Sequence, residues 1–135
     1  MRRIVIAVAA PALIFSLASC GADDSGTSAD AGLNKGNDVT VGLLLPETAN
    51  TRYEDFDYPI FKRKVAELTR GQGKVEYANA GADANKQAGQ MQQMIDSKVD
   101  IIVLDAVDSH AIAGMVQKAK DAGIPVIAYD RLAEG

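Results

Sequence analysis

The sequence has little of the chemistry that disulfides, metals and nucleic acids require. Among 135 residues there is one cysteine, Cys20, and one histidine, His110. These exclude a disulfide within the chain, a cysteine-rich metal site and a multi-histidine metal site. The net charge of −4 argues against a nucleic-acid partner. Stability must therefore come from a packed core, for which the hydrophobic content of 47% is ordinary.

The N-terminal segment has the layout of a secretory signal. Two arginines follow Met1, and residues 4–15 form an apolar stretch too short for an ordinary membrane span. The tetrapeptide Leu-Ala-Ser-Cys, which ends at Cys20, resembles the lipobox of bacterial lipoproteins. That resemblance implies removal of residues 1–19 and a diacylglycerol thioether on Cys20, which would anchor the protein in a membrane. The alternative is cleavage elsewhere, with Cys20 unmodified.

A polar stretch separates the signal from the folded chain. From Gly21 to Asp38 the residues are small or polar, with Leu33 and Lys35 as the only departures. Such a composition buries too little apolar surface to offset the entropy of ordering, so residues 20–38 are predicted to be a disordered spacer. The expected location is the outer face of the cytoplasmic membrane, as a cell-surface or periplasmic lipoprotein.

Residues 39–135 alternate between short apolar runs and helical patterns. The apolar runs predict buried strands at 39–45 and 101–104, and two further strands at 74–78 and 125–129. The apolar spacing between these runs predicts three helices. Their boundary signals are Pro59 in a first turn, caps at Asp83 and at Asp108 or Ser109, and stops at Gly71 and Gly123. His110 is expected to be solvated at the start of the third helix.

Alternating strands and helices indicate an α/β fold built from right-handed βαβ units. We expect an open parallel sheet with helices on both faces. The given sequence ends at Gly135, just past the fourth strand. We therefore expect residues 39–135 to be an incomplete domain, the front part of a larger protein.

Candidate ligand-binding residues follow the strands. In open parallel sheets, ligands bind outside the carboxyl ends of the strands. The loops there contain acidic, basic and aromatic side chains: Glu47, Thr48, Asn50, Arg52, Tyr53, Asp105, Asp108, Asp130 and Arg131. Carboxylate and guanidinium groups suit a ligand rich in hydroxyls, and Tyr53 could lie against a sugar ring. Each residue also has a plain explanation: the loop charges are solvated, Asp130 caps a following helix, or Tyr53 packs against the neighbouring helix.

Several segments resemble the D-xylose-binding proteins of ABC transporters. The stretch from Gly123 to Tyr129-Asp130-Arg131 is similar to that family, and Arg52-Tyr53 matches its arginine followed by an aromatic residue. The pattern from Asn79 through Gln87 to residues 100–103 also agrees. The resemblance extends from Val39 to the end of the chain.

The resemblance implies a partial N-terminal lobe of a type I periplasmic-binding fold, whose two lobes close around one sugar. It implies that Arg52, Asp130 and Arg131 hydrogen-bond sugar hydroxyls and that Tyr53 stacks on the ring. Glu47, Thr48 and Asp105 are weaker candidates. Tyr53 stands where a tryptophan is common, and Pro46-Glu47-Thr48 departs from the family's more acidic run. The implied partners are a monosaccharide, xylose or a related aldose, and an ABC permease, with no enzyme activity and no cofactor.

Other functions are also considered. A sugar-responsive repressor shares the fold but begins with a DNA-binding helix-turn-helix instead of an export signal. A phosphoacceptor receiver domain would use Asp105, but needs an acidic pair after the first strand, where only Glu47 is found. A secreted enzyme lacks support because no nucleophile elbow or phosphate-binding glycine motif is present. An exported module that presents a small molecule to a membrane receptor is the remaining alternative.

Overall fold

The computed structural model describes residues 36–135. The predicted signal at 1–19, the lipidation of Cys20 and nearly all of the 20–38 spacer therefore lie outside the described residues. Within 36–135, no helix has both the length and the apolar composition that a membrane crossing requires.

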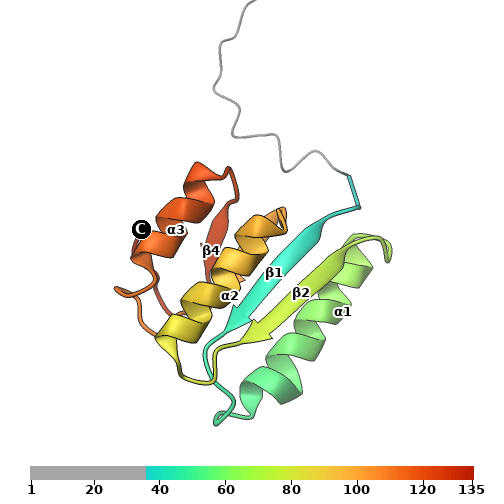
Figure 1. Cartoon of the computed structure of the whole chain (residues 1–135). Coiled ribbons are helices and arrows are strands. Elements are labelled where there is room, and N and C mark those ends of the chain that lie inside the picture. Colours follow the sequence, from blue (N-terminus) through green and yellow to red (C-terminus); the bar gives the residue numbers. More distant parts are fainter. Residues whose placement is uncertain (1–35) are drawn as a thin grey trace, which may run out of the picture.

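Four strands and three α-helices alternate along the described chain (Figure 1). A π-helical segment, η1, precedes the first α-helix. In chain order the elements are β1 (Thr40–Leu45), η1 (Tyr53–Asp57), α1 (Tyr58–Leu68), β2 (Lys74–Asn79), α2 (Ala84–Asp96), β3 (Ile101–Leu104), α3 (Ala113–Asp121) and β4 (Val126–Ala128). All strand pairs are parallel, in the order β2-β1-β3-β4, which confirms the α/β prediction.

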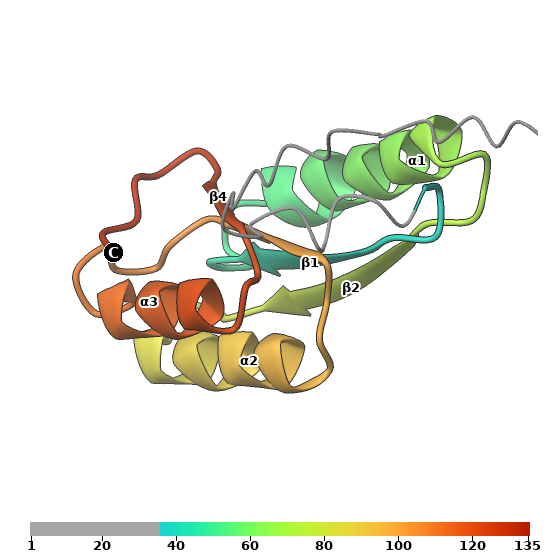
Figure 2. The ribbon, with the colours of Figure 1, turned by 90° about the horizontal axis from the view of Figure 1, so that it is seen from above.

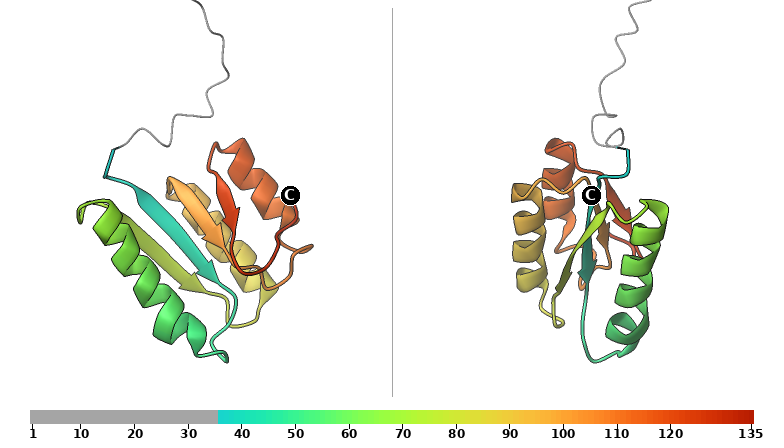
Figure 3. Two further views of the ribbon diagram at one scale, coloured as in Figure 1. Left: turned by 180° about the vertical axis from the view of Figure 1, so that it is seen from behind. Right: turned by 90° about the vertical axis from the view of Figure 1, so that its right-hand side faces the viewer.

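Helices cover the two faces of the sheet unequally. Helix α1 lies on one face, over β1 and β2, and helices α2 and α3 lie on the other (Figures 2 and 3). Successive residues of β1 point to opposite faces, so Leu43 packs toward α1 whereas Leu44 packs toward α2 and α3. On the α1 side, β4 is left open, and Ile127 is 49% exposed there although its β3 neighbour Val103 is buried.

A glycine allows α2 to lie close to the middle of the sheet. Gly42 is in β1, and a Cβ atom there would lie 2.6 Å from the sulfur of Met94 on α2. Met94 and Met91 are both buried against β1 and β3 in this layer. A side chain at position 42 would therefore force Met94 out of its place.

Two of the three helices begin where the sequence predicts. Pro59 lies in the first turn of α1. The carboxylate of Asp83 accepts hydrogen bonds from the backbone N–H groups of Asn85 and Lys86, at 2.8 and 3.0 Å, and so caps α2. Past the ends of α1 and α3, Gly71 and Gly123 have positive φ angles, as helix-terminating glycines do.

The prediction that Asp108 or Ser109 caps the third helix is wrong. Helix α3 begins at Ala113, and its N-cap residue, Ile112, makes no side-chain cap. The Asp108 carboxylate instead accepts from the N–H groups of His110 and Ala111, both at 2.9 Å, and closes a turn before the helix. An aspartate favours such a turn as readily as a helix cap, so its presence does not distinguish them. His110 is solvated in this turn, with 79% of its side chain exposed.

The sequence also failed to predict the π-helical segment. Residues 46–57 read from the sequence as a polar connection between β1 and α1, but Tyr53–Asp57 form η1. The N–H of Tyr58 donates to the carbonyl of Tyr53, five residues earlier, and α1 follows without a break. Single π turns occur often at functional sites.

We predict that core truncation destabilises the fold much more than the same change at its open edge. Ile102 in β3 is fully buried, and Ile127 in β4 is half exposed. Ile102→Val should lower the free energy of unfolding by about 0.5–1.5 kcal/mol, because a buried methyl group is lost. Ile127→Val should change it by less than about 0.5 kcal/mol. Urea unfolding followed by circular dichroism measures both, and equal losses would contradict the described core.

Candidate functional site

The candidate site lies where the strand order reverses. The chain passes from β1 to β2 on one side, and β3 and β4 lie on the other side of β1. The connection after β1 therefore leaves toward the α1 face, whereas the connection after β3 leaves toward the opposite face (Figure 2). This switch point lies at the carboxyl ends of β1 and β3, the place where open α/β sheets bind ligands.

Five of the predicted residues meet at this edge: Arg52, Tyr53, Asp105, Asp130 and Arg131. We call them the rim cluster. They come from the connections after β1, β3 and β4, and they contact one another through hydrogen bonds or close charged groups.

Arg52 and Asp130 form the ion pair that links the first and last loops. Nη2 of Arg52 donates to Oδ2 of Asp130 at 2.9 Å, across a separation of 78 residues. Arg52 holds the pKa of the Asp130 carboxyl below its usual range. Asp130 has a φ of +60°, a conformation that aspartate tolerates better than most residues. The tight turn there brings Asp130 and Arg131 into the cluster together.

Tyr53 contributes its hydroxyl group, and its ring is enclosed. The residue is 1% exposed and packs with Leu43, Leu45 and Val103. Its hydroxyl donates to Oδ2 of Asp130 at 3.3 Å, and the Arg52 guanidinium lies 4.7 Å from the ring centre. Burial raises the pKa of Tyr53 to about 12. The expected stacking of Tyr53 on a sugar ring is therefore not available in this arrangement, because protein atoms and Arg52 cover the ring.

Arg131, which is partly exposed, lies against the buried carboxylate of Asp105. Arg131 donates from Nη1 to the carbonyl of Ala106 at 3.2 Å and from Nη2 to the hydroxyl of Tyr53 at 3.5 Å. Its Nε lies 3.6 Å from Oδ1 of Asp105. Asp105 is fully buried, and neither of its carboxylate oxygens has a hydrogen-bond partner of normal geometry within the described part of the chain. Burial raises the pKa of Asp105 to about 6, and the positive charge of Arg131 opposes this rise.

Glu47 and Thr48 lie away from these contacts. Both are in the loop after β1, where Thr48 is exposed and Glu47 is partly exposed. The carbonyl of Glu47 accepts from the Asn79 amide at 2.9 Å, which ties this part of the loop to the end of β2. The structure thus brings the rim cluster together without these two, and also without Asn50 and Asp108, which bond neighbouring backbone N–H groups.

Asp57 is an additional member that sequence reasoning missed. Its Oδ2 accepts from Nε of Arg52 at 3.1 Å, so Arg52 is held between Asp57 and Asp130. The spacing of five residues between Arg52 and Asp57 follows one π turn, whereas an α-helix pairs residues three or four apart. No pattern in the sequence indicated this turn.

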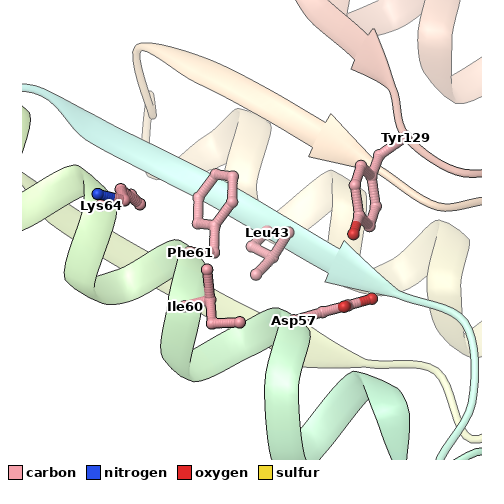
Figure 4. Close-up of a pocket in the computed structure, with 6 residues that line it drawn as sticks. All are labelled: Leu43, Asp57, Ile60, Phe61, Lys64 and Tyr129. Atoms are coloured by element: carbon pink, nitrogen blue, oxygen red, sulfur yellow. The ribbon is translucent and has the colours of Figure 1, made fainter.

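An apolar groove lies beside the rim cluster on the α1 face (Figure 4). It has a volume of about 250 Å³ and is lined by Leu43, Asp57, Ile60, Phe61, Lys64 and Tyr129. Tyr129 extends from the end of β4 toward Asp57, and burial raises the pKa of Tyr129. The apolar lining does not suit a ligand rich in hydroxyls, so we do not assign the ligand to this groove.

The fold and the position of the rim cluster define the class: an open parallel α/β domain with a cluster of polar side chains at its switch point. A family described as periplasmic binding protein domain matches residues 41–135. The chain belongs to this family, whose members are solute-binding proteins and not enzymes.

Relatives and solved structures agree with this assignment. The chain is 36% identical to the multiple sugar-binding periplasmic receptor ChvE of Rhizobium radiobacter over 94 residues, which cover 69% of this chain and 25% of the receptor. It is 30% identical to the D-xylose-binding periplasmic protein of Escherichia coli over 95 residues, which cover 70% of this chain and 28% of that protein. The crystal structure of an ABC transporter solute-binding protein from Clostridium phytofermentans with bound β-D-glucose superposes on this chain with a TM-score of 0.62 and 27% identity. The match covers 69% of this chain and 28% of that protein. The chain thus spans about a quarter of the length of these relatives.

We predict a pH-dependent penalty for burying Asp105. Its pKa is about 6 in the folded chain and near 3.8 when exposed, so the folded state holds more protons between these values. The contribution of the Asp105 carboxyl to the free energy of unfolding therefore falls as the pH rises from about 4 to about 6. Asp105→Asn should raise the free energy of unfolding by about 1–3 kcal/mol at pH 7, and by little near pH 4.

Urea unfolding of both proteins over this pH range measures the difference. Comparing them at each pH removes the contributions of Asp130 and Glu67, whose lowered pKa values act in the opposite direction. A difference that is constant with pH would show that the Asp105 carboxylate carries no such penalty.

Proposed function

We propose that the complete protein is an extracytoplasmic solute-binding lipoprotein that captures a monosaccharide, xylose or a related aldose, and delivers it to an ABC permease. The observation that carries this proposal is the rim cluster itself. It gathers carboxylates, guanidinium groups and a hydroxyl from three separate loops at the switch point of the sheet.

The chemistry of the rim cluster suits sugar hydroxyls. A hydroxyl both donates and accepts, so it can bond a carboxylate and a guanidinium at the same time. Asp130 supplies an acceptor, and Arg52 and Arg131 supply the donors, as charge-assisted hydrogen bonds. Tyr53 takes part through its hydroxyl. Asp105, whose carboxylate is fully buried behind Arg131, stays a weaker candidate, as do Glu47 and Thr48 at the outer part of the loop after β1.

The relatives support the class of ligand without choosing among sugars. One is named for xylose and another for multiple sugars, and structures from Clostridium phytofermentans and Actinobacillus succinogenes contain β-D-glucose and D-allose. Since this chain spans about a quarter of its relatives, the opposing face of the crevice is expected from a second lobe. The 135-residue chain alone should bind sugars weakly or not at all.

We predict that Arg131→Ala weakens sugar binding by the complete protein. The loss should exceed about 1.5 kcal/mol, because a charge-assisted hydrogen bond disappears from a closed site. Titration calorimetry against a panel of pentoses and hexoses measures it. Arg63→Ala is the matched control, since Arg63 lies on α1 and pairs with Glu67 at 3.7 Å. No heat from any sugar with folded protein would overturn the transport function, whereas unchanged affinity in Arg131→Ala would remove Arg131 from the site.

The proposed anchor has a separate test. Cys20→Ser should abolish incorporation of labelled fatty acid and move the exported protein from the membrane fraction to the soluble fraction, because the acyl chains supply the membrane affinity. The unchanged protein, expressed in parallel, is the control. Membrane association that survives Cys20→Ser would refute anchoring through this residue.

A further inference from the structure

A buried glutamine lies behind the rim cluster, on the opposite side of the sheet. Gln87 is in the first turn of α2 and is 1% exposed. Its helix neighbours on the same side, Met91 and Met94, are core residues. An amide at such a position is unfavourable unless both its donor and its acceptor are bonded.

Both ends of the Gln87 amide bond the backbone just after β3. Nε2 donates to the carbonyl of Asp105 at 2.8 Å, and Oε1 accepts from the N–H of Val107 at 2.9 Å. The N–H of Asp105 donates to the carbonyl of Leu44 at 2.9 Å, at the end of the β1–β3 pairing. Gln87 therefore continues the backbone pairing where the sheet itself no longer provides a partner.

The segment held by Gln87 carries two groups of the rim cluster. One is the buried carboxylate of Asp105, and the other is the carbonyl of Ala106, which accepts from Nη1 of Arg131 at 3.2 Å. Ala106 lies between the two residues that Gln87 bonds. A shift of this backbone would therefore move the Asp105 side chain and the anchor of Arg131 together.

We propose that Gln87 is a positioning residue for the binding site, which holds Asp105 and Arg131 in place from the far side of the sheet. The proposal rests on the proposed function for its biological meaning. Its physical content concerns the arrangement of Asp105 and Arg131 in the ligand-free chain, and can be tested without a sugar.

Gln90 provides a matched control on the same helix. Its Nε2 donates to the carbonyl of Asn79 at 2.9 Å, which is the same kind of bond, but to the end of β2. Gln87→Met and Gln90→Met each keep side-chain length. The first removes two bonds, to Asp105 and Val107 after β3, and the second removes one bond, to Asn79 at the end of β2.

The test is NMR spectroscopy of the isotope-labelled 135-residue chain, with thermal unfolding measured in parallel. In Gln87→Met, the side-chain Nε–H signal of Arg131 and the carboxyl titration of Asp105 should shift. The Val107 amide should exchange with solvent roughly tenfold faster, because its hydrogen bond is lost. Gln90→Met should leave these three readouts unchanged, even with a comparable loss of Tm.

A second variant keeps the proposal falsifiable if Gln87→Met fails to fold. Gln87→Glu preserves the shape of the side chain and the acceptor for the Val107 N–H. It can donate to the backbone carbonyl of Asp105 only when the glutamic acid is protonated. As the pH is lowered, the Arg131 Nε–H signal of this variant should therefore approach the signal that the unchanged chain gives at the same pH. Loss of Tm without any change at Arg131, Asp105 or Val107 would show that Gln87 only fills the core, and would overturn the proposal. This outcome is independent of whether any sugar binds.

Discussion

The parallel pairing of β1 with β3 is the constraint on which the rest of the structure depends. Leu44 lies opposite Leu104 in this pairing, so both strands end at the same edge of the sheet. The next backbone bond, from Asp105 N–H to the Leu44 carbonyl, places Asp105 directly beside the loop that carries Arg52 and Tyr53. Because β4 is parallel to β3, Asp130 and Arg131 reach the same edge.

Burial and charge oppose each other at this edge. Asp105 is fully buried, and such a carboxylate is unstable unless a positive group is near. The Nε of Arg131, at 3.6 Å, supplies that charge at longer than hydrogen-bond distance. Asp130, by contrast, is bonded directly by Arg52 and remains ionised. The two carboxylates thus have different environments, although they lie within one cluster.

The sequence was sufficient to predict most of the fold and the five residues of the rim cluster, but not the contact of Asp57 with Arg52. Continuous apolar runs identify strands that are buried on both faces, and the Asp83 cap locates the start of α2. Sequence could not reveal η1, because a π turn has no distinct composition. It left two explanations open for Tyr53, and the structure favours packing, since the residue is 1% exposed. The burial of Gln87 could have been predicted from its spacing, because it lies four residues before Met91, on the apolar side of its helix.

The existing bonds of the rim cluster determine what a ligand must offer. Asp130 already accepts from Arg52 and Tyr53, so a bound molecule exchanges one set of hydrogen bonds for another. The affinity then depends on the difference between the two sets. An anion could pair with the arginines, but it would leave the carboxylates of Asp105 and Asp130 facing a like charge. A neutral molecule with several hydroxyls can donate to the Asp130 carboxylate and accept from the arginines together. Physical complementarity therefore favours a neutral polyhydroxylated ligand, independently of the names of the relatives.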